Sequence, residues 1–139
     1  MIDSREMKSL VAILSLLFAS QTPTTCDREC LRGFLDRYLT ALSAHKPEDV
    51  PEVPNLRFTE DTMEMKLGEG LWKTAGKLSP YRLDILDVRQ GIAGTHTILE
   101  ENGKRVMLVL RMKIEARKIT EVETQVAMPQ NTPSGWDAR

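Results

Sequence analysis

The chain has 139 residues, with 19 basic and 20 acidic side chains and a net charge of −1. Its length fits a single domain with one core, because domains commonly run to about 100–150 residues. A hydrophobic fraction of 41% beside a charged fraction of 28% excludes a mostly disordered chain. The nearly balanced charge provides no basic field for nucleic acid or anionic lipid, so we expect neither as a partner.

An uncharged run of ten residues, Leu10 to Ala19, lies near the start of the chain. It is too short to cross a bilayer as a helix, which takes about 20 apolar residues, and it matches the hydrophobic region of a secretory signal peptide. Asp3 and Glu6 offset the positive charge that should precede such a region, and a start at Met7 restores it. A buried N-terminal helix is the alternative. We interpret residues 1–25 as a signal peptide, which predicts a secreted or periplasmic protein that leaves the membrane after cleavage.

The two cysteines, Cys26 and Cys30, follow directly after this segment. In an exported protein such a pair indicates a disulfide, and residues four apart on a helix have Cα atoms about 6 Å apart, inside the range that a disulfide spans. Cys26 would close the bond more easily from just outside the helix. Free structural thiols are the alternative. The spacing differs from the Cys-x-x-Cys of redox enzymes, and only His45 and His96 could add metal ligands, so we expect no metal.

An amphipathic helix is predicted over Asp27–Ala44. Thr24 and Thr25 precede it as capping hydroxyls commonly do. Apolar side chains then recur at helical spacing, at Leu31, Phe34, Leu35, Tyr38, Leu39 and Leu42. The prolines that follow predict a loop over Lys46–Asn55, with one short turn at Pro47–Asp49.

Most of the remaining chain has the pattern of short and long strands. Alternating apolar and polar residues predict strands at Leu56–Glu60, Thr62–Leu67, Tyr81–Val88, Gly91–Glu100, Arg105–Ala116 and Ile119–Ala127. Glycines bracket Leu71–Ala75, where we predict a short helix or turn with Trp72 pointing inward. The pair Asn102-Gly103 indicates a tight hairpin.

One long helix followed by several antiparallel strands predicts an α+β fold. We expect a cone-shaped domain over residues 26–127, in which a curved antiparallel sheet wraps the N-terminal helix, and a flexible polar tail at 128–139. The Arg105–Ala116 strand has one apolar face and a mixed face that carries Met107 and Val109. The mixed face indicates either a dimer surface or ordinary apolar exposure.

Three runs of the sequence carry a family resemblance: CDRECLRGFLDRYLTALSAHKPEDVP, RFTED and LGEGLW. They resemble an exported branch of the nuclear-transport-factor-2-like superfamily that is found in bacteria and fungi. This superfamily of cone-shaped α+β domains includes SnoaL-like polyketide cyclases, ketosteroid isomerase and scytalone dehydratase. The likeness covers Cys26 to Val126 and implies acid–base side chains inside the cone. The catalytic motifs of these enzymes match no positions of this sequence, so the resemblance implies no particular reaction or cofactor.

Two residues are candidates for acid–base chemistry in such a pocket. His96 shares its strand face with Ile92, Gly94 and Ile98, and an inward imidazole would titrate near neutral pH. Glu123 shares its strand face with Glu121, and an apolar site would raise the pKa of an inward carboxyl. The alternatives are a surface histidine and a solvated row of acids. We name His96 and Glu123 as candidate catalytic residues.

Three aromatic residues with polar tips, Tyr38, Trp72 and Tyr81, are candidates for the pocket wall, with core packing as the alternative. The sequence thus predicts a secreted domain that binds a small, partly apolar molecule without a cofactor, with isomerisation, dehydration or cyclisation as candidate reactions. The alternative function is a non-enzymatic, homodimeric interaction domain with a filled core. A pocket lined by these aromatics, His96 and a glutamate favours the first function, and a packed interior with an exposed apolar sheet favours the second.

Overall fold

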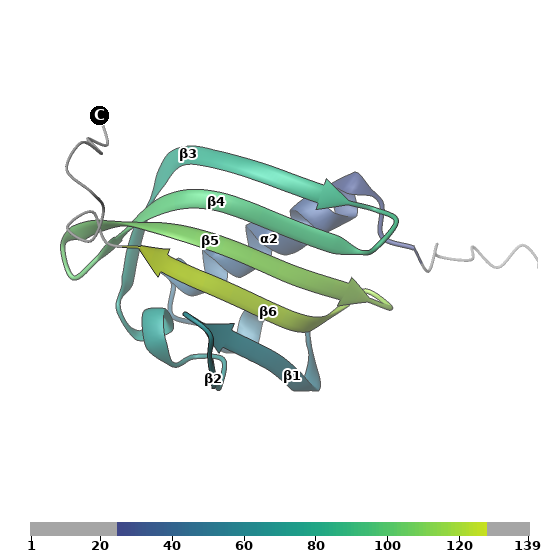
Figure 1. Cartoon of the computed structure of the whole chain (residues 1–139), viewed down its shortest axis with the longest axis horizontal. Helices are drawn as coiled ribbons and strands as arrows, with labels where there is room; N and C mark the ends of the chain where they lie inside the picture. The colour runs from purple at the N-terminus through teal and green to yellow at the C-terminus, as the bar shows by residue number, and fades with distance from the viewer. Residues whose placement is uncertain (1–24, 128–139) are drawn as a thin grey trace, which may run out of the picture.

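The computed structural model describes residues 25–127 (Figure 1). Its helices are α2 (Arg28–Ser43), η2 (Pro47–Asp49) and η3 (Gly70–Lys73), of which the last two are 3₁₀ helices. Its strands are β1 (Glu52–Glu60), β2 (Met63–Met65), β3 (Ala75–Asp87), β4 (Ile92–Glu101), β5 (Lys104–Glu115) and β6 (Lys118–Ala127). The predicted signal peptide apart from Thr25, the start at Met7 and the tail at 128–139 lie outside the described residues.

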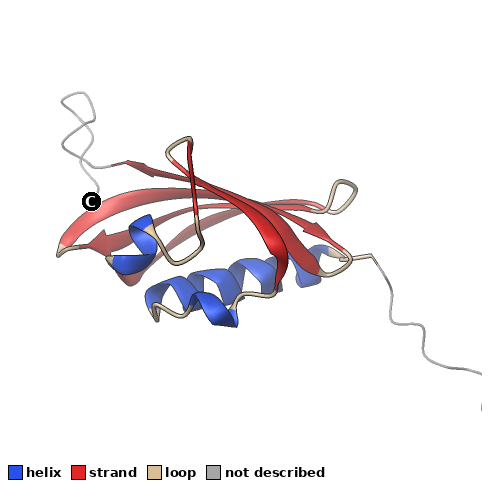
Figure 2. Ribbon diagram, turned by 90° about the horizontal axis from the view of Figure 1, so that it is seen from below, coloured by secondary structure: helices blue, strands red, loops and turns tan. Residues whose placement is uncertain are grey.

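The strands form one curved sheet in the order β2-β1-β6-β5-β4-β3. β3, β4, β5 and β6 run antiparallel in sequence, and β2 pairs antiparallel with β1. α2 lies across the concave face of the sheet (Figure 2). The α+β fold with a curved sheet on one long helix is therefore confirmed. One pairing differs from the expected antiparallel sheet, because β1 runs parallel to β6.

The core lies between α2 and the concave face of the sheet. The helix contributes the stripe that its spacing predicted, with Leu31, Leu35, Tyr38, Leu39 and Leu42 buried. β5 contributes the predicted face, with Val106, Leu108, Leu110, Met112 and Ile114 buried. The predicted hairpin at Asn102-Gly103 is also present, with positive φ at both residues as a tight turn of this kind requires.

α2 begins one residue later than predicted, and its cap is an acid in place of a threonine hydroxyl. The Asp27 carboxylate accepts a hydrogen bond from the backbone N–H of Cys30 at 2.9 Å. Cys26 lies just before this cap, so its side chain reaches forward to the first turn of the helix. The predicted disulfide joins Cys26 to Cys30, with 5.2 Å between their Cα atoms. No free cysteine is present among the described residues.

We expect the Cys26→Ser/Cys30→Ser variant to lose about 2 kcal/mol of unfolding free energy, because the five-residue loop constrains the unfolded chain only modestly. Urea denaturation followed by circular dichroism measures this loss. The unmodified protein in a reducing agent is the matched control and should lose the same amount. An unfolded double variant would contradict this expectation, since it would give the disulfide an essential role in the fold.

The C-terminal end of α2 is fixed by its own backbone and by η3. The N–H of His45 donates to the carbonyl of Leu42 at 3.1 Å, and the N–H of Lys46 donates to the carbonyl of Ala41 at 2.9 Å. These two hydrogen bonds end the helix and accompany a positive φ of 56° at His45. Its Nδ1–H donates to the carbonyl of Trp72 at 2.6 Å, so the helix end holds η3 in place.

Two strands are longer than predicted, and both contain a proline that the sequence pattern assigned to a loop or a turn. β1 begins at Glu52 and includes Pro54, and β3 begins at Ala75 and includes Pro80. Pro80 is tolerated because β3 is an edge strand, and Pro54 lies where the pairing of β1 with β6 is irregular. The predicted loop over Lys46–Asn55 is therefore shorter, and the predicted turn at Pro47–Asp49 is present as η2.

Candidate functional site

Two of the predicted pocket residues, Tyr38 and Trp72, fill the interior between helix and sheet. Tyr38 is 0% exposed and Trp72 is 2% exposed. The rings meet edge to face at a centroid distance of 5.1 Å, and the indole N–H of Trp72 donates to the Tyr38 hydroxyl at 3.1 Å. Burial, together with the carboxylates of Glu60 and Glu52, raises the pKa of Tyr38 above its ordinary value. The pair therefore packs the core as a neutral unit.

The other predicted aromatic, Tyr81, lies with His96 on the convex face of the sheet. The neighbours of His96 in β4, Thr95 and Thr97, are buried toward α2, so the alternation of the strand turns the imidazole away from the helix. The Tyr81 hydroxyl lies 3.0 Å from Nδ1 of His96, and the two rings meet edge to face at 5.5 Å. His96 therefore has a polar partner, on the face opposite the one that a cone pocket requires.

Glu123 also lies on the convex face, where it takes part in an ion-pair network. Nη1 of Arg111 lies 2.6 Å from Glu121 and 3.2 Å from Glu123. Glu123 is paired across the strands with Arg111, whereas His96 is paired with Val109, so the structure does not bring the two candidate catalytic residues together. The row of acids on β6 has the solvated arrangement that we gave as the alternative.

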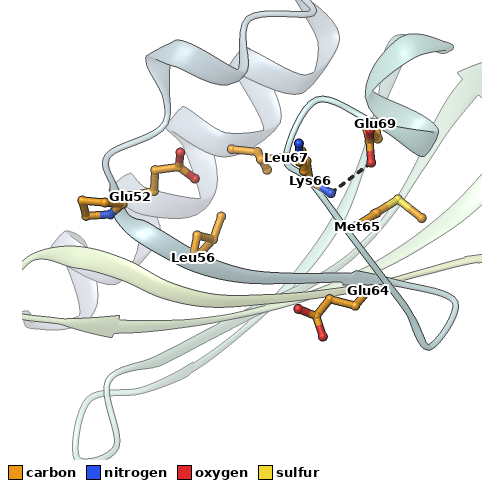
Figure 3. A pocket seen from close by; sticks show the side chains of 8 residues that line it. Glu52, Leu56, Glu64, Met65, Lys66, Leu67 and Glu69 are labelled. Atoms are coloured by element: carbon orange, nitrogen blue, oxygen red, sulfur yellow. Dashed lines mark hydrogen bonds between the residues drawn. The ribbon is translucent and has the colours of Figure 1, made fainter.

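The structure instead offers a cavity of about 660 Å³ at the β1 side of the molecule (Figure 3). It lies between β1, β2 and the loop that leads to η3. Its lining combines apolar and charged side chains: Glu52, Pro54, Leu56, Glu64, Met65, Lys66, Leu67 and Glu69. Figure 3 shows Glu52, Leu56 and Leu67 pointing toward one another, while Glu64 points away from them.

The loop that borders this cavity is held by its own hydrogen bonds and by glycines. Glu69 accepts a hydrogen bond from the N–H of Lys66 at 3.0 Å, and its own N–H donates to the carbonyl of Lys66 at 3.0 Å. Gly68 has a φ of 95°, and a Cβ at this position would lie 3.2 Å from Pro47 of η2. This close approach brings the loop against η2.

A second acid, Glu60, anchors η3 beside the cavity. Both of its carboxylate oxygens accept from the N–H of Leu71, at 3.0 and 3.1 Å. Gly70 has a φ of 61°, which glycine adopts without strain, and a Cβ there would displace this carboxylate. Burial raises the pKa of Glu60 even though the Leu71 hydrogen bond opposes this shift. Glu60 is thus committed to holding η3, and it is not among the residues that line the cavity.

Glu52 is the residue that gives the cavity its chemical character. Its Oε2 atom is buried and has no hydrogen-bond partner, a condition it shares with two other side-chain atoms of the described residues. Burial raises the pKa of the carboxyl above the ordinary value of 4.5. A buried acceptor without a partner carries an energetic cost, and the carboxyl group that holds this atom belongs to a residue that lines the cavity.

We expect Glu52→Gln to raise the unfolding free energy at pH 7 by about 0.5 kcal/mol, or the melting temperature by about 2 °C. The folded state holds the Glu52 proton more tightly than the unfolded state does, because its pKa is raised. This contribution to stability is complete below the unfolded pKa and is lost as the pH rises through the folded pKa. Glutamine does not titrate, so the gain should appear at pH 7 and vanish near pH 4. A constant difference across this range would contradict the interpretation.

Sequence reasoning missed Glu52 because it lies between two prolines in a segment that was predicted as a loop. Among residues 25–127, no three His, Cys, Asp or Glu side chains gather in a way that could hold a metal ion. No helix in this part of the chain is long and apolar enough to cross a membrane.

No protein-family model and no curated protein matches this sequence. Solved structures match by shape. A nuclear-transport-factor-2-like protein of unknown function from Burkholderia xenovorans has a TM-score of 0.56 at 14% identity, covering 75% of this chain and 88% of its own. AclR from Streptomyces galilaeus, named as a hydroxylase, has a TM-score of 0.57 at 12% identity, with coverages of 80% and 91%.

A Kribbella flavida protein named as a ketosteroid isomerase has a TM-score of 0.53 at 12% identity, covering 76% of this chain and 83% of its own. At these identities the likeness establishes the fold and leaves the activity open. The chain therefore has the nuclear-transport-factor-2-like fold, in agreement with the resemblance that its sequence motifs carry.

Proposed function

We propose that this protein binds a small, partly apolar molecule in the cavity beside β1, with Glu52 as the polar anchor. The observation that carries the proposal is a cavity of about 660 Å³ that Glu52 lines together with Leu56 and Leu67, where the carboxyl of Glu52 has an unpartnered oxygen and a raised pKa. Ligand sites commonly combine apolar walls with a few polar groups that fix the orientation of the ligand.

The charges of the lining indicate which ligands fit. Glu52, Glu64 and Glu69 contribute three acids, and Lys66 is the one base. Glu52 offers an acceptor, so the ligand must supply a donor next to its apolar part. An amine satisfies both the acceptor and the negative surroundings, and a hydroxyl satisfies the acceptor alone.

The geometry supports binding more directly than turnover. Proton transfer to or from a bound ligand commonly requires an acid–base group whose pKa is suitably shifted. Glu52 meets this requirement, because its pKa is raised. The imidazole of His96, which the sequence offered as a catalytic candidate, lies on the convex face with Tyr81. A binding domain is therefore the function that these positions favour.

Benzylamine is a suitable probe, with toluene as the matched molecule that lacks a donor. Calorimetric titration of the full chain should give saturable benzylamine binding, with a Kd on the order of 1 mM or tighter. Glu52→Gln should weaken this binding at least about tenfold, because the charge-assisted hydrogen bond is lost. Glu48→Gln is the matched control and should bind as the unmodified protein does, since Glu48 is exposed in η2 and does not line the cavity. Equal effects of the two substitutions, or tighter binding of toluene, would refute the proposal.

A second function, self-association through the convex face of the sheet, is favoured by a separate observation. Four large apolar side chains on β3 and β5 are strongly exposed there: Tyr81 at 46%, Leu83 at 54%, Ile85 at 67% and Val109 at 42%. Contiguous apolar surface of this kind commonly marks a protein interface. The neighbouring charges of Arg111, Glu121 and Glu123 are already paired within the chain, so a second copy would meet few unpaired charges.

Sedimentation equilibrium tests this second proposal. The unmodified chain should sediment as a dimer at micromolar concentration, and Leu83→Glu/Ile85→Glu should sediment as a monomer with unchanged circular dichroism. A chain that remains monomeric at all concentrations would exclude the homodimer.

Export is proposed from the hydrophobic run at residues 10–19 and from the disulfide. A disulfide persists in oxidising compartments outside the cytoplasm, which supports a secreted or periplasmic location for this protein. Mass spectrometry of the protein recovered from its host should find a chain that begins between residues 21 and 26. A full-length chain with reduced cysteines would contradict the proposal.

A further inference from the structure

A second cavity, separate from the one beside β1, lies against the N-terminal half of α2 and has the opposite charge. Its volume is about 290 Å³, and it is lined by Cys30, Gly33, Phe34, Arg37, Pro51 and Arg117. Both charged residues in this lining are arginines, and no acid lines the cavity. No ion pair joins Arg37 or Arg117 to an acid among residues 25–127.

The helix supplies one wall of this cavity through a single face. Cys30, Gly33, Phe34 and Arg37 are spaced three and four residues apart, so they line up along α2. Gly33 keeps the middle of this row open, since a Cβ there would meet no atom within 4 Å. Phe34 packs partly against the core and leaves part of its ring accessible to the cavity.

The opposite wall is held in place by the sheet. The N–H of Ile119 donates to the carbonyl of Pro51 at 2.9 Å, which fixes the β5–β6 turn next to the segment that precedes β1. Arg117 lies in this turn. Backbone pairing therefore fixes the position of Arg117 beside the cavity that Arg37 also lines.

The turn itself has a conformation that its residues disfavour. Ala116 and Arg117 have φ values of 47° and 59°, the left-handed region that asparagine and glycine prefer. The β4–β5 turn of the same sheet has the preferred pair, Asn102-Gly103, in the same region. A disfavoured residue in a tight turn is often retained for its side chain, and at this turn the side chain is the guanidinium that lines the cavity.

We propose that this cavity binds the carboxylate of a small organic acid between Arg37 and Arg117, with its apolar body against Phe34 and Pro51. Guanidinium groups match the planar, two-oxygen geometry of a carboxylate, and two of them neutralise its charge. The apolar wall distinguishes an organic acid from an inorganic anion, which has no apolar part to place there. This site is independent of Glu52, and it goes beyond the ligand proposed for the first cavity.

Benzoate is the probe, with inorganic phosphate at equal ionic strength as the competing anion. Calorimetric titration of the full chain should give saturable benzoate binding with a Kd on the order of 1 mM. Arg37→Ala should weaken it at least about tenfold, and Gly33→Leu should abolish it by filling the cavity while both arginines remain. Arg89→Ala removes an exposed arginine from the β3–β4 turn and serves as the matched control.

The turn provides an independent readout. Ala116→Asn/Arg117→Gly should raise the melting temperature by about 5 °C, because it installs the preferred turn pair, and should weaken benzoate binding at least tenfold. Benzylamine binding should be unchanged in all four variants, which separates this site from the one at Glu52. The proposal is overturned if benzoate fails to bind, if Arg89→Ala weakens binding as much as Arg37→Ala does, or if phosphate binds as tightly as benzoate.

Discussion

Replacing Trp72 by alanine is expected to lower the free energy of unfolding by about 4 kcal/mol. The indole is 2% exposed and packs from η3 against Tyr38 of α2, so its removal leaves a void that the helix and sheet cannot close. The variant also removes the edge-to-face contact with Tyr38 and leaves the tyrosine hydroxyl without its donor. Urea denaturation followed by circular dichroism measures the loss.

Two further variants make this expectation specific. Tyr38→Phe keeps the ring and removes only the hydroxyl, so it should cost about 1 kcal/mol by leaving the indole N–H unpaired. Met63→Ala, at a side chain that is 68% exposed, should cost less than about 0.5 kcal/mol. If Trp72→Ala cost no more than Met63→Ala, Trp72 would be the accessible pocket wall that the sequence suggested, and the filled interior would be wrong.

Replacing Arg82 by leucine is expected to lower the free energy of unfolding by about 2 kcal/mol. This arginine lies in β3 and hydrogen-bonds Asp36 of α2 and Asp84 of its own strand, so it links the helix to the sheet edge. Burial opposes its charge, but the hydrogen bonds that the guanidinium donates to Asp84 and Asp36 outweigh burial and hold its pKa above its ordinary value. The variant would leave the mostly buried carboxylate of Asp84 without its nearest cation.

Arg57→Leu is the matched control for the loss of the Arg82 charge. Arg57 lies 3.7 Å from Glu121 with more than half of its side chain exposed, so its loss should cost less than about 0.5 kcal/mol. Adding Asp84→Asn to Arg82→Leu should recover part of the stability, because it removes the unpaired charge. A double variant that is less stable than Arg82→Leu would show that burial of Asp84 is not the source of the cost.

The elements with strong periodicity could be predicted from the sequence. The helix was predicted within one residue at each end because its apolar stripe is long and prolines follow it. The Asn102-Gly103 hairpin and the buried face of β5 were predicted because turn chemistry and strand alternation act locally. The disulfide was predicted because its two cysteines are four residues apart.

The site could not be predicted, because its residues meet only through pairings that the sequence leaves open. Alternation places His96 on one face of β4 but does not say which face meets α2. Glu52 reaches its cavity because β1 pairs in parallel with β6, a connection that no local signal marks. Prolines on both sides of Glu52 made this segment resemble a loop, although Pro54 lies in an irregular part of the strand.

The tyrosine and tryptophan were correctly predicted to face inward, but their side chains pack against each other and leave no room for a ligand between them. A polar-tipped aromatic suits a pocket wall or a core equally well, and the choice depends on whether its polar tip finds a partner in the protein. Here the Trp72 indole finds the Tyr38 hydroxyl, and the cavity lies to the side of both.

The central claim is that the interior of the cone is filled and that ligand binds beside β1. An amide proton–nitrogen correlation spectrum of the full chain, recorded during a benzylamine titration, tests it most directly. We expect saturable shifts at Glu52, Leu56 and Leu67, and none at Thr95 or Thr97 in the middle of the concave face. Shifts concentrated at Thr95 and Thr97, or no saturable shift at Glu52, would contradict the claim.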